Sequence, residues 1–525
     1  MEADELESRP FLSIPEHLNI AHAIVDRHVA AGRGGKIAAW AGDRGYTYAE
    51  LRDLSNRFGN VLRGLGVGRG DRVLLRLGTN MYSMIAILGA IKIGAVIIPS
   101  NFLFRDHEVE KILHNSEAII AVSTAELAGP IEAVRGRGLA LKQVIIAGGT
   151  GELSWDRLME NASAELVCER TFANELAFII YTSGTTGDPK GVEQAHRWII
   201  GAGDPVNHLM VRLRPDDICY QPQDWSFMYP LGSSFFFPLF FGATIVLHEG
   251  RFEAEAALRT IERRAVTIFH GVPTIYRMMA AVPGAESRFN LRSLRMGVSA
   301  GEALPADTFR DWRERLGVTV HDGIGQTECH IFIANKLGAR IKPGSMGRPL
   351  PGYEVAVLDD SGAPAKPGEP GHLVFRNDSA GLALGYRNDA ERWAAVNRGG
   401  WYYTKDITYV DDEGYYWYVS RSDDLIKSRA YLISPKEVES ALLEHPAVLE
   451  AAVVGIETAA GEHRVKAYLT LKPGNQANDA LVHDIKAHVR GVIALYKVPQ
   501  DIEFAAELPK TANGKILRRE LRARA

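Results

Sequence analysis

The sequence predicts an α/β protein with a large N-terminal domain of layered, largely parallel sheets plus a β-subdomain, and a small mobile α/β C-terminal domain. Three observations support this prediction. Helical and strand patterns alternate along the first part of the chain. After residue 350 the pattern changes to short strands around Gly/Pro-rich turns. The chain has 525 residues, which is too long for one hydrophobic core.

The alternation begins with a helix that follows Thr47. Thr47 and Glu50 have the spacing of a capping box, and apolar residues recur behind them at helical intervals as far as Leu65. Gly66 is expected to end this helix before a strand at 73–75. Further helix and strand pairs are expected at 84–93 with 95–98, 107–114 with 118–122, and 254–264 with 265–269.

The later part of the chain predicts a β-subdomain and a lid. Residues 353–358 and 372–375 read as short strands around the turn GAPAKPGEPG. The charged stretch 421–424 lies between two ordered blocks and is the expected hinge. We therefore predict a large domain at 1–421, with its β-subdomain at about 350–421, and a small lid domain at 422–525.

One uncharged segment, 225–247, is long enough to span a bilayer. It contains two prolines and two glycines, and no basic residues flank it in a way that would orient it. A buried helix followed by a buried strand is the preferred interpretation, with a membrane span as the alternative.

Composition excludes several classes of protein. The net charge of −4 gives no nucleic-acid footprint. Three cysteines without a CxxC pair argue against a disulfide framework or a zinc site. The acidic N-terminus has no apolar signal region, so we expect a cytoplasmic protein without integral membrane contact.

A loop rich in glycine and hydroxyl residues at 181–191 reads YTSGTTGDPKG. It follows the apolar run 176–180, which predicts a buried strand. Backbone N–H groups, hydroxyls and the Lys190 ammonium suit the oxygens of a polyphosphate, and glycine lets the backbone approach them. The loop is not a Walker A motif, because no G-K-[ST] tripeptide follows four residues after a glycine. A flexible surface linker is the alternative, but the preceding strand argues against it.

Further motifs follow in order: SAGEAL at 299–304, GIGQTE at 323–328, GSMGRP at 344–349, YTKD at 403–406, RSDDLIK at 421–427 and LPKTANGKILRREL at 508–521. Together with the loop they resemble the adenylate-forming superfamily, which includes acyl-CoA synthetases, peptide-synthetase adenylation domains and luciferases. The resemblance covers nearly the whole chain. It implies an enzyme that joins a carboxylate to the α-phosphate of ATP and expels pyrophosphate, so that a thiol can then displace AMP.

The resemblance assigns most of the site to the nucleotide. Lys515 matches the lysine that bridges the substrate carboxylate and the α-phosphate, Thr327 matches a phosphate contact, and Glu328 matches the magnesium ligand. These three residues are the predicted catalytic group. The other residues predicted to bind ATP or AMP are Thr182, Ser183, Gly184, Thr185, Thr186, Gly187, Lys190, Gly301, Glu302, Ala303, Asp322, Gly323, Ile324, Gly325, Gln326, Asp406 and Arg421.

The remaining roles follow from the same resemblance. Asp406 matches the aspartate that accepts both ribose hydroxyls, and Arg421 matches the ribose-side arginine. Asp423 matches the hinge about which the small domain swings between half-reactions. The acyl pocket is predicted from Trp225, Phe227, Met228, Tyr229 and His330, and the CoA channel from Ala430 and Tyr431.

Three positions depart from the family's usual pattern. Ile324 stands where tyrosine is usual, and Lys405 replaces the glycine of T-G-D, which leaves the adenine fit and the turn before Asp406 open. Ala430 replaces a glycine beside the pantetheine channel. This change leaves open whether the thioester step proceeds or the reaction stops at the adenylate.

We therefore predict an AMP-forming acid–CoA ligase that uses ATP, Mg²⁺ and CoA. Segments such as GIGQTECHIF resemble benzoate-CoA ligases and medium-chain acyl-CoA synthetases, which favours an aromatic, alicyclic, branched or medium-chain acid. The alternative is a stand-alone adenylation enzyme that passes its acyl group to a carrier protein. No carrier segment follows the lysine motif, which favours CoA. An idle binding protein is hard to reconcile with Glu328, Asp406 and Lys515. The expected partners are a small carboxylic acid and CoA, with a homodimer left open.

Overall fold

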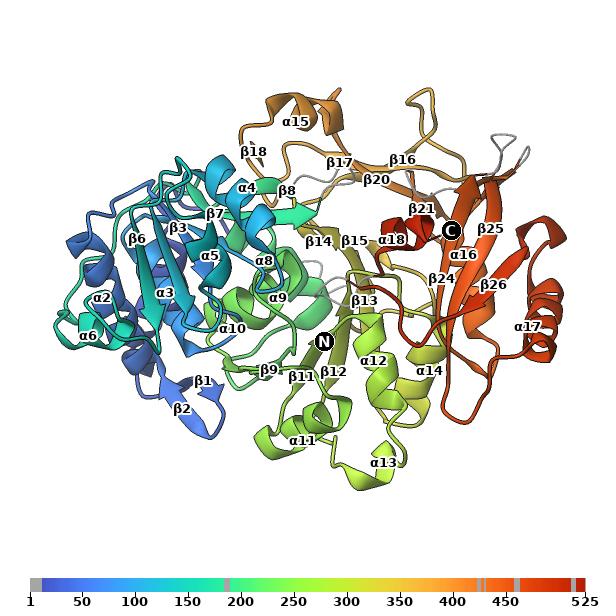
Figure 1. The fold of residues 1–525 in the computed structure, drawn as a ribbon, viewed down its shortest axis with the longest axis horizontal. Helices are drawn as coiled ribbons and strands as arrows, with labels where there is room; N and C mark the ends of the chain where they lie inside the picture. The colour runs from blue at the N-terminus through green and yellow to red at the C-terminus, as the bar shows by residue number, and fades with distance from the viewer. Residues whose placement is uncertain are drawn as a thin grey trace.

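The computed structural model describes residues 12–183, 189–422, 426–428, 431–457, 463–510 and 516–524. Figure 1 shows a seven-stranded sheet at the left, a nine-stranded sheet in the middle, an antiparallel sheet above and a small C-terminal sheet at the right. The mixed α/β architecture with layered, largely parallel sheets, a β-subdomain and a C-terminal unit confirms the predicted fold class.

The seven-stranded sheet has the order β18-β8-β7-β4-β3-β5-β6. Strands β3 to β7 run parallel, whereas β8 pairs antiparallel with both β7 and β18. The bounds are β3 Arg72–Arg76, β4 Val96–Pro99, β5 Ile120–Thr124, β6 Gln143–Ala147, β7 Leu176–Ser183, β8 Pro189–Ala195 and β18 Gly385–Tyr386. One face packs on α2 and α3, and the other on α4 and α5.

The nine-stranded sheet has the order β15-β14-β13-β12-β11-β9-β10-β1-β2. Its centre is parallel and its two edges are antiparallel. The bounds are β1 Ile37–Ala41, β2 Arg44–Thr47, β9 Ile218–Tyr220, β10 Thr244–Val246, β11 Ile268–Gly271, β12 Met296–Ala300, β13 Val320–Gln326, β14 His330–Ala334 and β15 Arg348–Pro349.

Three smaller sheets complete the described chain. The antiparallel sheet contains β16 Val355–Leu358, β17 Gly371–Arg376, β19 Asn397–Arg398, β20 Trp401–Val410 and β21 Tyr416–Arg421. A two-stranded ribbon pairs β22 Ile426–Ser428 with β23 Tyr431–Ile433. The C-terminal sheet contains β24 Val448–Glu457, β25 His463–Leu471 and β26 Asp501–Phe504, with α16 and α17 packed on one face.

The helices lie between and outside these sheets (Figure 1). Their bounds are α2 Tyr48–Gly64, α3 Met81–Lys92, α4 Asp106–Ser116, α5 Gly129–Val134, α6 Trp155–Glu160, α7 Trp198–Gly201, α8 Gly203–Val206, α9 Met228–Leu231, α10 Phe237–Phe240, α11 Ala254–Arg264, α12 Pro273–Ala280, α13 Ala285–Arg288, α14 Ala306–Glu314, α15 Ala390–Val396, α16 Pro435–Leu443, α17 Asp479–Val492 and α18 Arg518–Ala523. Short π-helical or 3₁₀ turns lie at His22–Asp26, Val29–Arg33, Asn207–Val211, Gly232–Phe236 and Leu495–Lys497.

The predicted capping box is present at the start of α2. The Thr47 hydroxyl accepts from the Glu50 N–H, and the Glu50 carboxylate accepts from the Thr47 N–H at 2.8 Å. Gly66 follows the helix at a φ of 83°, so glycine ends the helix as expected. By contrast, β11 starts three residues later than predicted, because Ala265 caps α11 in the left-handed region at a φ of 49°.

The apolar segment 225–247 forms a buried helical stretch, from α9 through the turn at Gly232–Phe236 to α10, and then strand β10. Phe235, Phe236 and Leu239 belong to the main core cluster. Among the described residues, no helix is both long enough and apolar enough to cross a bilayer. The prediction of a buried helix followed by a strand is therefore confirmed.

One motif glycine makes a close backbone approach that tolerates no side chain. Gly347, in the segment GSMGRP, has a φ of 93°, and a Cβ there would lie 2.1 Å from the Ala334 carbonyl oxygen. Its own carbonyl accepts from the Tyr416 N–H at 2.9 Å, which links the nine-stranded sheet to the antiparallel sheet. Gly338 has a similar φ of 80° but open space around its Cα.

We expect Gly347→Ala to destabilise the protein by clearly more than Gly338→Ala. The control variant has only the left-handed backbone penalty, about 1–2 kcal/mol, whereas Gly347→Ala adds a backbone clash at the junction of two sheets. Urea denaturation followed by circular dichroism measures both changes. If both variants lost the same free energy of unfolding, the contact between the two sheets at Gly347 would accommodate a side chain without added strain.

Candidate functional site

A cavity of about 500 Å³, here called the central cavity, lies where the two large sheets, the antiparallel sheet and the C-terminal helices α16 and α18 meet. The predicted nucleotide residues whose side chains the structure describes all line it: Thr182, Lys190, Gly301, Glu302, Ala303, Asp322, Gly323, Ile324, Gly325, Gln326, Thr327, Glu328, Asp406 and Arg421. Four predicted acyl residues, Phe227, Met228, Tyr229 and His330, line the same cavity.

Other predicted residues lie elsewhere. Trp225 does not line the central cavity; it is 2% exposed, stacks on Phe235 at 4.5 Å and donates to the Ser234 hydroxyl at 3.1 Å, so the structure places it in the core. Gly184, Thr185, Thr186, Gly187, Asp423, Ala430 and Lys515 lie outside the described residues. Ser183 ends β7 and Tyr431 begins β23, and only their main chains are described.

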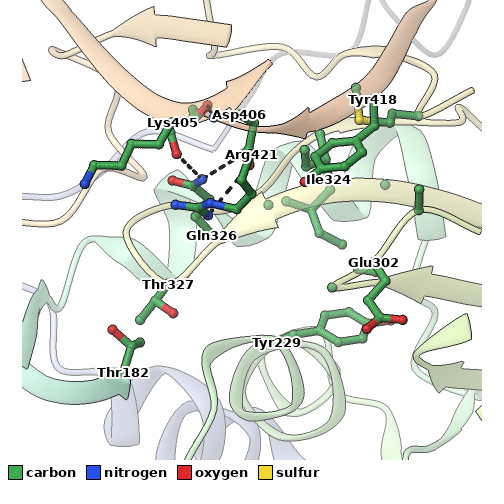
Figure 2. Close-up of a pocket in the computed structure, with 18 of the residues that line it drawn as sticks. Thr182, Tyr229, Glu302, Ile324, Gln326, Thr327, Lys405, Asp406, Tyr418 and Arg421 are labelled. Carbon is green, nitrogen blue, oxygen red and sulfur yellow. Dashed lines mark hydrogen bonds and ion pairs between the residues drawn. The ribbon is translucent and has the colours of Figure 1, made fainter. Parts of the chain in front are cut away.

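Figure 2 shows how the side chains divide the central cavity. Thr182 and Thr327 lie together at one end, Tyr229 and Glu302 lie at another, and Gln326, Asp406 and Arg421 lie along the opposite side. Lys190 faces Thr182 across the β7–β8 ladder, because these two residues are paired in register. The two strands leading into and out of the glycine-rich loop thus bring a hydroxyl and a cation to one end of the cavity.

The turn between β13 and β14 presents Thr327 and Glu328 to the cavity. A register shift between Ile324 and Gly325 bends the ladder, and a Cβ on Gly325 would lie 2.1 Å from the His330 carbonyl oxygen. Only glycine therefore fits at position 325. The Thr327 carbonyl accepts from Gln194 Nε2 at 2.9 Å, which fixes the turn to the neighbouring sheet.

Glu328 is a buried carboxylate of the cavity that is held by a cation and a phenol. Its Oε1 accepts from Lys190 Nζ and from the Tyr386 hydroxyl, each at 2.7 Å, and Lys190 also lies 4.1 Å from the centre of the Tyr386 ring. Burial opposes ionisation of Glu328, but the Lys190 charge and the two hydrogen bonds outweigh it, so the pKa is lowered from 4.5. Glu328 is therefore an anion at neutral pH.

Asp322 lies in the same cavity in a contrasting environment. Its Oδ2 accepts from the Leu304 N–H at 3.1 Å, while Oδ1 has no hydrogen-bond partner among the described residues. No cation comparable to Lys190 is paired with it there, and burial raises its pKa to about 7. The Asp322 carboxyl group is thus poised between its neutral and charged forms near neutral pH.

The polar side of the cavity is built around Asp406. Gln326 Nε2 donates to Asp406 Oδ2 at 2.8 Å and to the Thr404 carbonyl at 2.6 Å, and the Arg421 guanidinium lies 3.6 Å from Asp406 Oδ1. Lys405 has a φ of 66°, so the turn keeps the left-handed conformation that glycine favours although lysine occupies the position. The open question about this turn is thereby answered for the backbone.

Several cavity residues carry no sequence signal that would have revealed them. Tyr386 comes from the edge strand β18 far along the chain, and Lys436, Glu439 and Arg518 come from the C-terminal helices. Arg518 donates to both oxygens of Glu439, at 2.7 and 2.9 Å. Ile516, the residue after Lys515, also lines the cavity, so the lysine motif is the sequence feature that points to this wall.

Two family models match the chain. The model described as AMP-binding enzyme matches residues 26–387, and the model described as AMP-binding enzyme C-terminal domain matches residues 437–515. Together these matches cover most of the central cavity.

Individual proteins are similar over their full length. Benzoate–CoA ligase from Thauera aromatica is 41% identical over 524 residues, covering 99% of each chain. The anthranilate CoA ligase AuaEII, solved in complex with anthranoyl-AMP, is 36% identical with a TM-score of 0.92 over 100% of this chain and 99% of that one. A benzoate CoA ligase from Burkholderia xenovorans LB400 is 32% identical with a TM-score of 0.87 over 96% and 99%.

The buried pair of Lys190 and Glu328 gives a stability prediction. Lys190→Met leaves a buried carboxylate without its cation. We expect it to lower the free energy of unfolding by ~3–5 kcal/mol at pH 7. Because the folded-state pKa of Glu328 lies below 4.5, the pair's contribution is present above that pH and is lost as the pH falls further. We therefore expect Lys190→Met to lower the free energy of unfolding by less at acidic pH than at neutral pH. Urea denaturation at both pH values measures this difference.

The double variant Lys190→Met/Glu328→Gln is the control for this prediction. It removes both charges, so it should recover most of the stability lost in the single variant at pH 7. A single-variant loss that does not change with pH, or a double variant that is no more stable, would contradict the pairing.

Proposed function

Because the chain belongs to the AMP-binding enzyme family, that is, to the adenylate-forming superfamily, we propose that it is an acid–CoA ligase that activates an aromatic acid through an acyl-adenylate. The balanced reaction has two steps. The acid and ATP give the acyl-adenylate and pyrophosphate, and the acyl-adenylate and CoA then give the acyl-CoA thioester and AMP. Similarity to proteins named as benzoate and anthranilate CoA ligases supports the aromatic class; alicyclic, branched and medium-chain acids are the wider set.

The observation that carries this proposal is the continuity of the central cavity. One space joins the cationic end at Lys190 to the polar side at Asp406 and to the apolar wall of Phe227, Met228 and Tyr229. A molecule with a polyphosphate, a ribose and an apolar acyl group needs such an arrangement. A phosphate site alone would not need the aromatic wall.

We assign the first step to positioning and electrostatics. Attack of the acid carboxylate on the α-phosphorus spreads negative charge over the phosphoryl oxygens, and cations and hydroxyls held in place stabilise that charge. In this proposal Thr182, Thr327 and Lys190 bind the phosphate oxygens. The Asp406 carboxylate accepts hydrogen bonds from the ribose hydroxyls. Lys515 bridges the carboxylate and the α-phosphate in this proposal, supported by Ile516 beside it on the cavity wall.

A magnesium ion fits the donor set at Glu328. Its carboxylate is a hard oxygen ligand that is already ionised, and the Thr327 hydroxyl precedes it on the same turn. Mg²⁺ held by Glu328 would supply positive charge that offsets the charge on the phosphate oxygens.

For the second step we propose that residues 422–525 act as a lid that swings about Asp423. Lys515 must leave before a thiol can reach the adenylate, and one mobile lid serves both half-reactions. Lys436, Glu439, Ile516 and Arg518 already close the cavity in the described arrangement, which suits the first step. The alternative function, transfer to a carrier protein, uses the same first step and differs only in the thiol.

The proposed function and the role of Lys515 can be tested together. The wild-type protein should catalyse ATP–pyrophosphate exchange that depends on an aromatic acid, and should form the thioester with CoA. Lys515→Ala should slow the exchange by ~10²–10³, the cost of removing one stabilising donor, yet should convert supplied acyl-adenylate to thioester.

Lys510→Ala is a matched control for Lys515→Ala. Lys510 belongs to the same motif, but its ammonium is paired with Glu450 at 2.6 Å, so exchange should stay near the wild-type rate. Equal losses in both half-reactions for Lys515→Ala would refute its role. Acyl transfer to a carrier protein but not to CoA would favour the alternative function.

The proposed hinge has its own test. Asp423→Pro fixes φ near about −65°, which should hold the lid in one arrangement. We expect nearly normal acid-dependent exchange with loss of thioester formation. A variant that forms acyl-CoA at the wild-type rate would show that no rotation at Asp423 is needed.

A further inference from the structure

Two buried histidines pack against Tyr229 at the apolar end of the central cavity. His330 on β14 has its ring centre 6.0 Å from that of Tyr229, and His270 on β11 has its ring centre 6.3 Å away. Both histidines are 2% exposed. His330 lines the cavity with Tyr229, whereas His270, on β11 of the same nine-stranded sheet as His330, is not one of the lining residues.

The four ring nitrogens of His270 and His330 have no hydrogen-bond partner among the described residues. The Tyr229 carbonyl lies near His330 but forms no bond of normal geometry with it. Other buried histidines are different: His28 meets the Leu239 carbonyl at 2.7 Å, and His321 meets the Asn335 carbonyl at 3.0 Å. Buried polar groups are normally paired, because leaving one unpaired costs free energy. The protein therefore bears a cost at this end of the cavity that a bound group can offset.

The backbone of His330 adopts a conformation that its residue type rarely takes. Its φ of 65° lies in the left-handed region, which few side chains adopt. Its ring fits only because residue 232 is glycine, since a Cβ there would lie 2.7 Å from His330 Nε2. Trp198 and Phe237 pack edge to face against the ring, at 5.6 and 4.8 Å. A strained polar side chain kept in an aromatic box points to a function for its nitrogens.

The chemistry of the two rings restricts what they can bind. Each neutral imidazole offers one N–H donor and one nitrogen acceptor. The Tyr229 hydroxyl donates to the Val298 carbonyl at 2.9 Å. This set suits a group that both donates and accepts a hydrogen bond, such as a hydroxyl or an amino group.

We propose that the acid carries a hydrogen-bonding ring substituent, a hydroxyl or an amino group, which His330 contacts beside Tyr229 on the cavity wall, while His270 packs against Tyr229. This inference rests on the proposed function, since it names a feature of the acid that the same site activates. The apolar wall of Phe227 and Met228 then binds the ring itself.

The test compares substituents of similar size in the wild-type enzyme. ATP–pyrophosphate exchange is measured with benzoate and with the ortho, meta and para isomers of hydroxybenzoate, aminobenzoate and methylbenzoate. At one ring position at least, we expect hydroxybenzoate or aminobenzoate to have a kcat/KM about tenfold or more above that of the methylbenzoate with the same substitution pattern. The reason is that a site built for a hydrogen bond rejects a group that lacks it. Benzoate or methylbenzoates that are used as well as or better than every polar isomer would overturn the proposal.

Variants assign the preference to these residues. His270→Leu keeps a similar volume, and His330→Asn keeps a residue that tolerates the left-handed backbone; each should reduce the preference to about threefold or less while benzoate is still activated. His321→Leu is the control, because it removes a buried imidazole that already has a partner, and it should leave the preference unchanged. A preference that survives both site variants, or that His321→Leu abolishes equally, would overturn the assignment.

Failure of the proposed function would look different. If none of these acids supports exchange, the acid–CoA ligase proposal fails. If benzoate supports exchange and thioester formation without any preference for polar substituents, the proposed function stands and this inference fails. A melting curve for each variant separates loss of the fold from loss of specificity, and the wild-type panel decides the question if a variant does not fold.

Discussion

The buried contact of Glu328 with Lys190 and Tyr386 is the interaction on which the site depends, because it joins two sheets at the central cavity. Glu328 lies on the turn between β13 and β14 of the nine-stranded sheet, while Lys190 and Tyr386 lie on β8 and β18 of the seven-stranded sheet. The Ala383 N–H adds a backbone bond to the Glu328 carbonyl at 2.7 Å. The phosphate-loop strands and the GIGQTE turn are thus held in one place by charge-assisted hydrogen bonds, which are stronger than neutral ones.

Two carboxyl groups in this cavity have opposite properties because their surroundings differ. Glu328 has a cation and a phenol beside it, and its pKa is lowered; Asp322 has no such cation, and burial raises its pKa to about 7. The chain therefore places a fixed negative charge where Mg²⁺ and phosphates are proposed to bind. It places an adjustable carboxyl group on the wall predicted to face adenine, where a fixed charge without a partner would be costly.

Local patterns predicted much of the fold, and motif spacing predicted much of the cavity wall. The capping box at Thr47 and helix α11 at Ala254–Arg264 follow from short-range rules, and these rules held because they need no distant partner. The sequence could not show that Trp225 would stack on Phe235 in the core, since an aromatic residue beside a predicted pocket suits either place. Nor could it show Tyr386 or His270, whose roles depend on strands that meet only in the folded chain.

The central claim is that the acid's carboxylate attacks the α-phosphorus of ATP within this cavity. The most direct measurement is a single turnover with an aromatic acid whose carboxylate oxygens are isotopically heavy, followed by mass analysis of the products. The account predicts that one heavy oxygen from the acid appears in AMP and none in pyrophosphate, because AMP leaves with a former carboxylate oxygen when the thiol attacks. Heavy oxygen found in inorganic phosphate or pyrophosphate, or AMP that contains none, would contradict an acyl-adenylate.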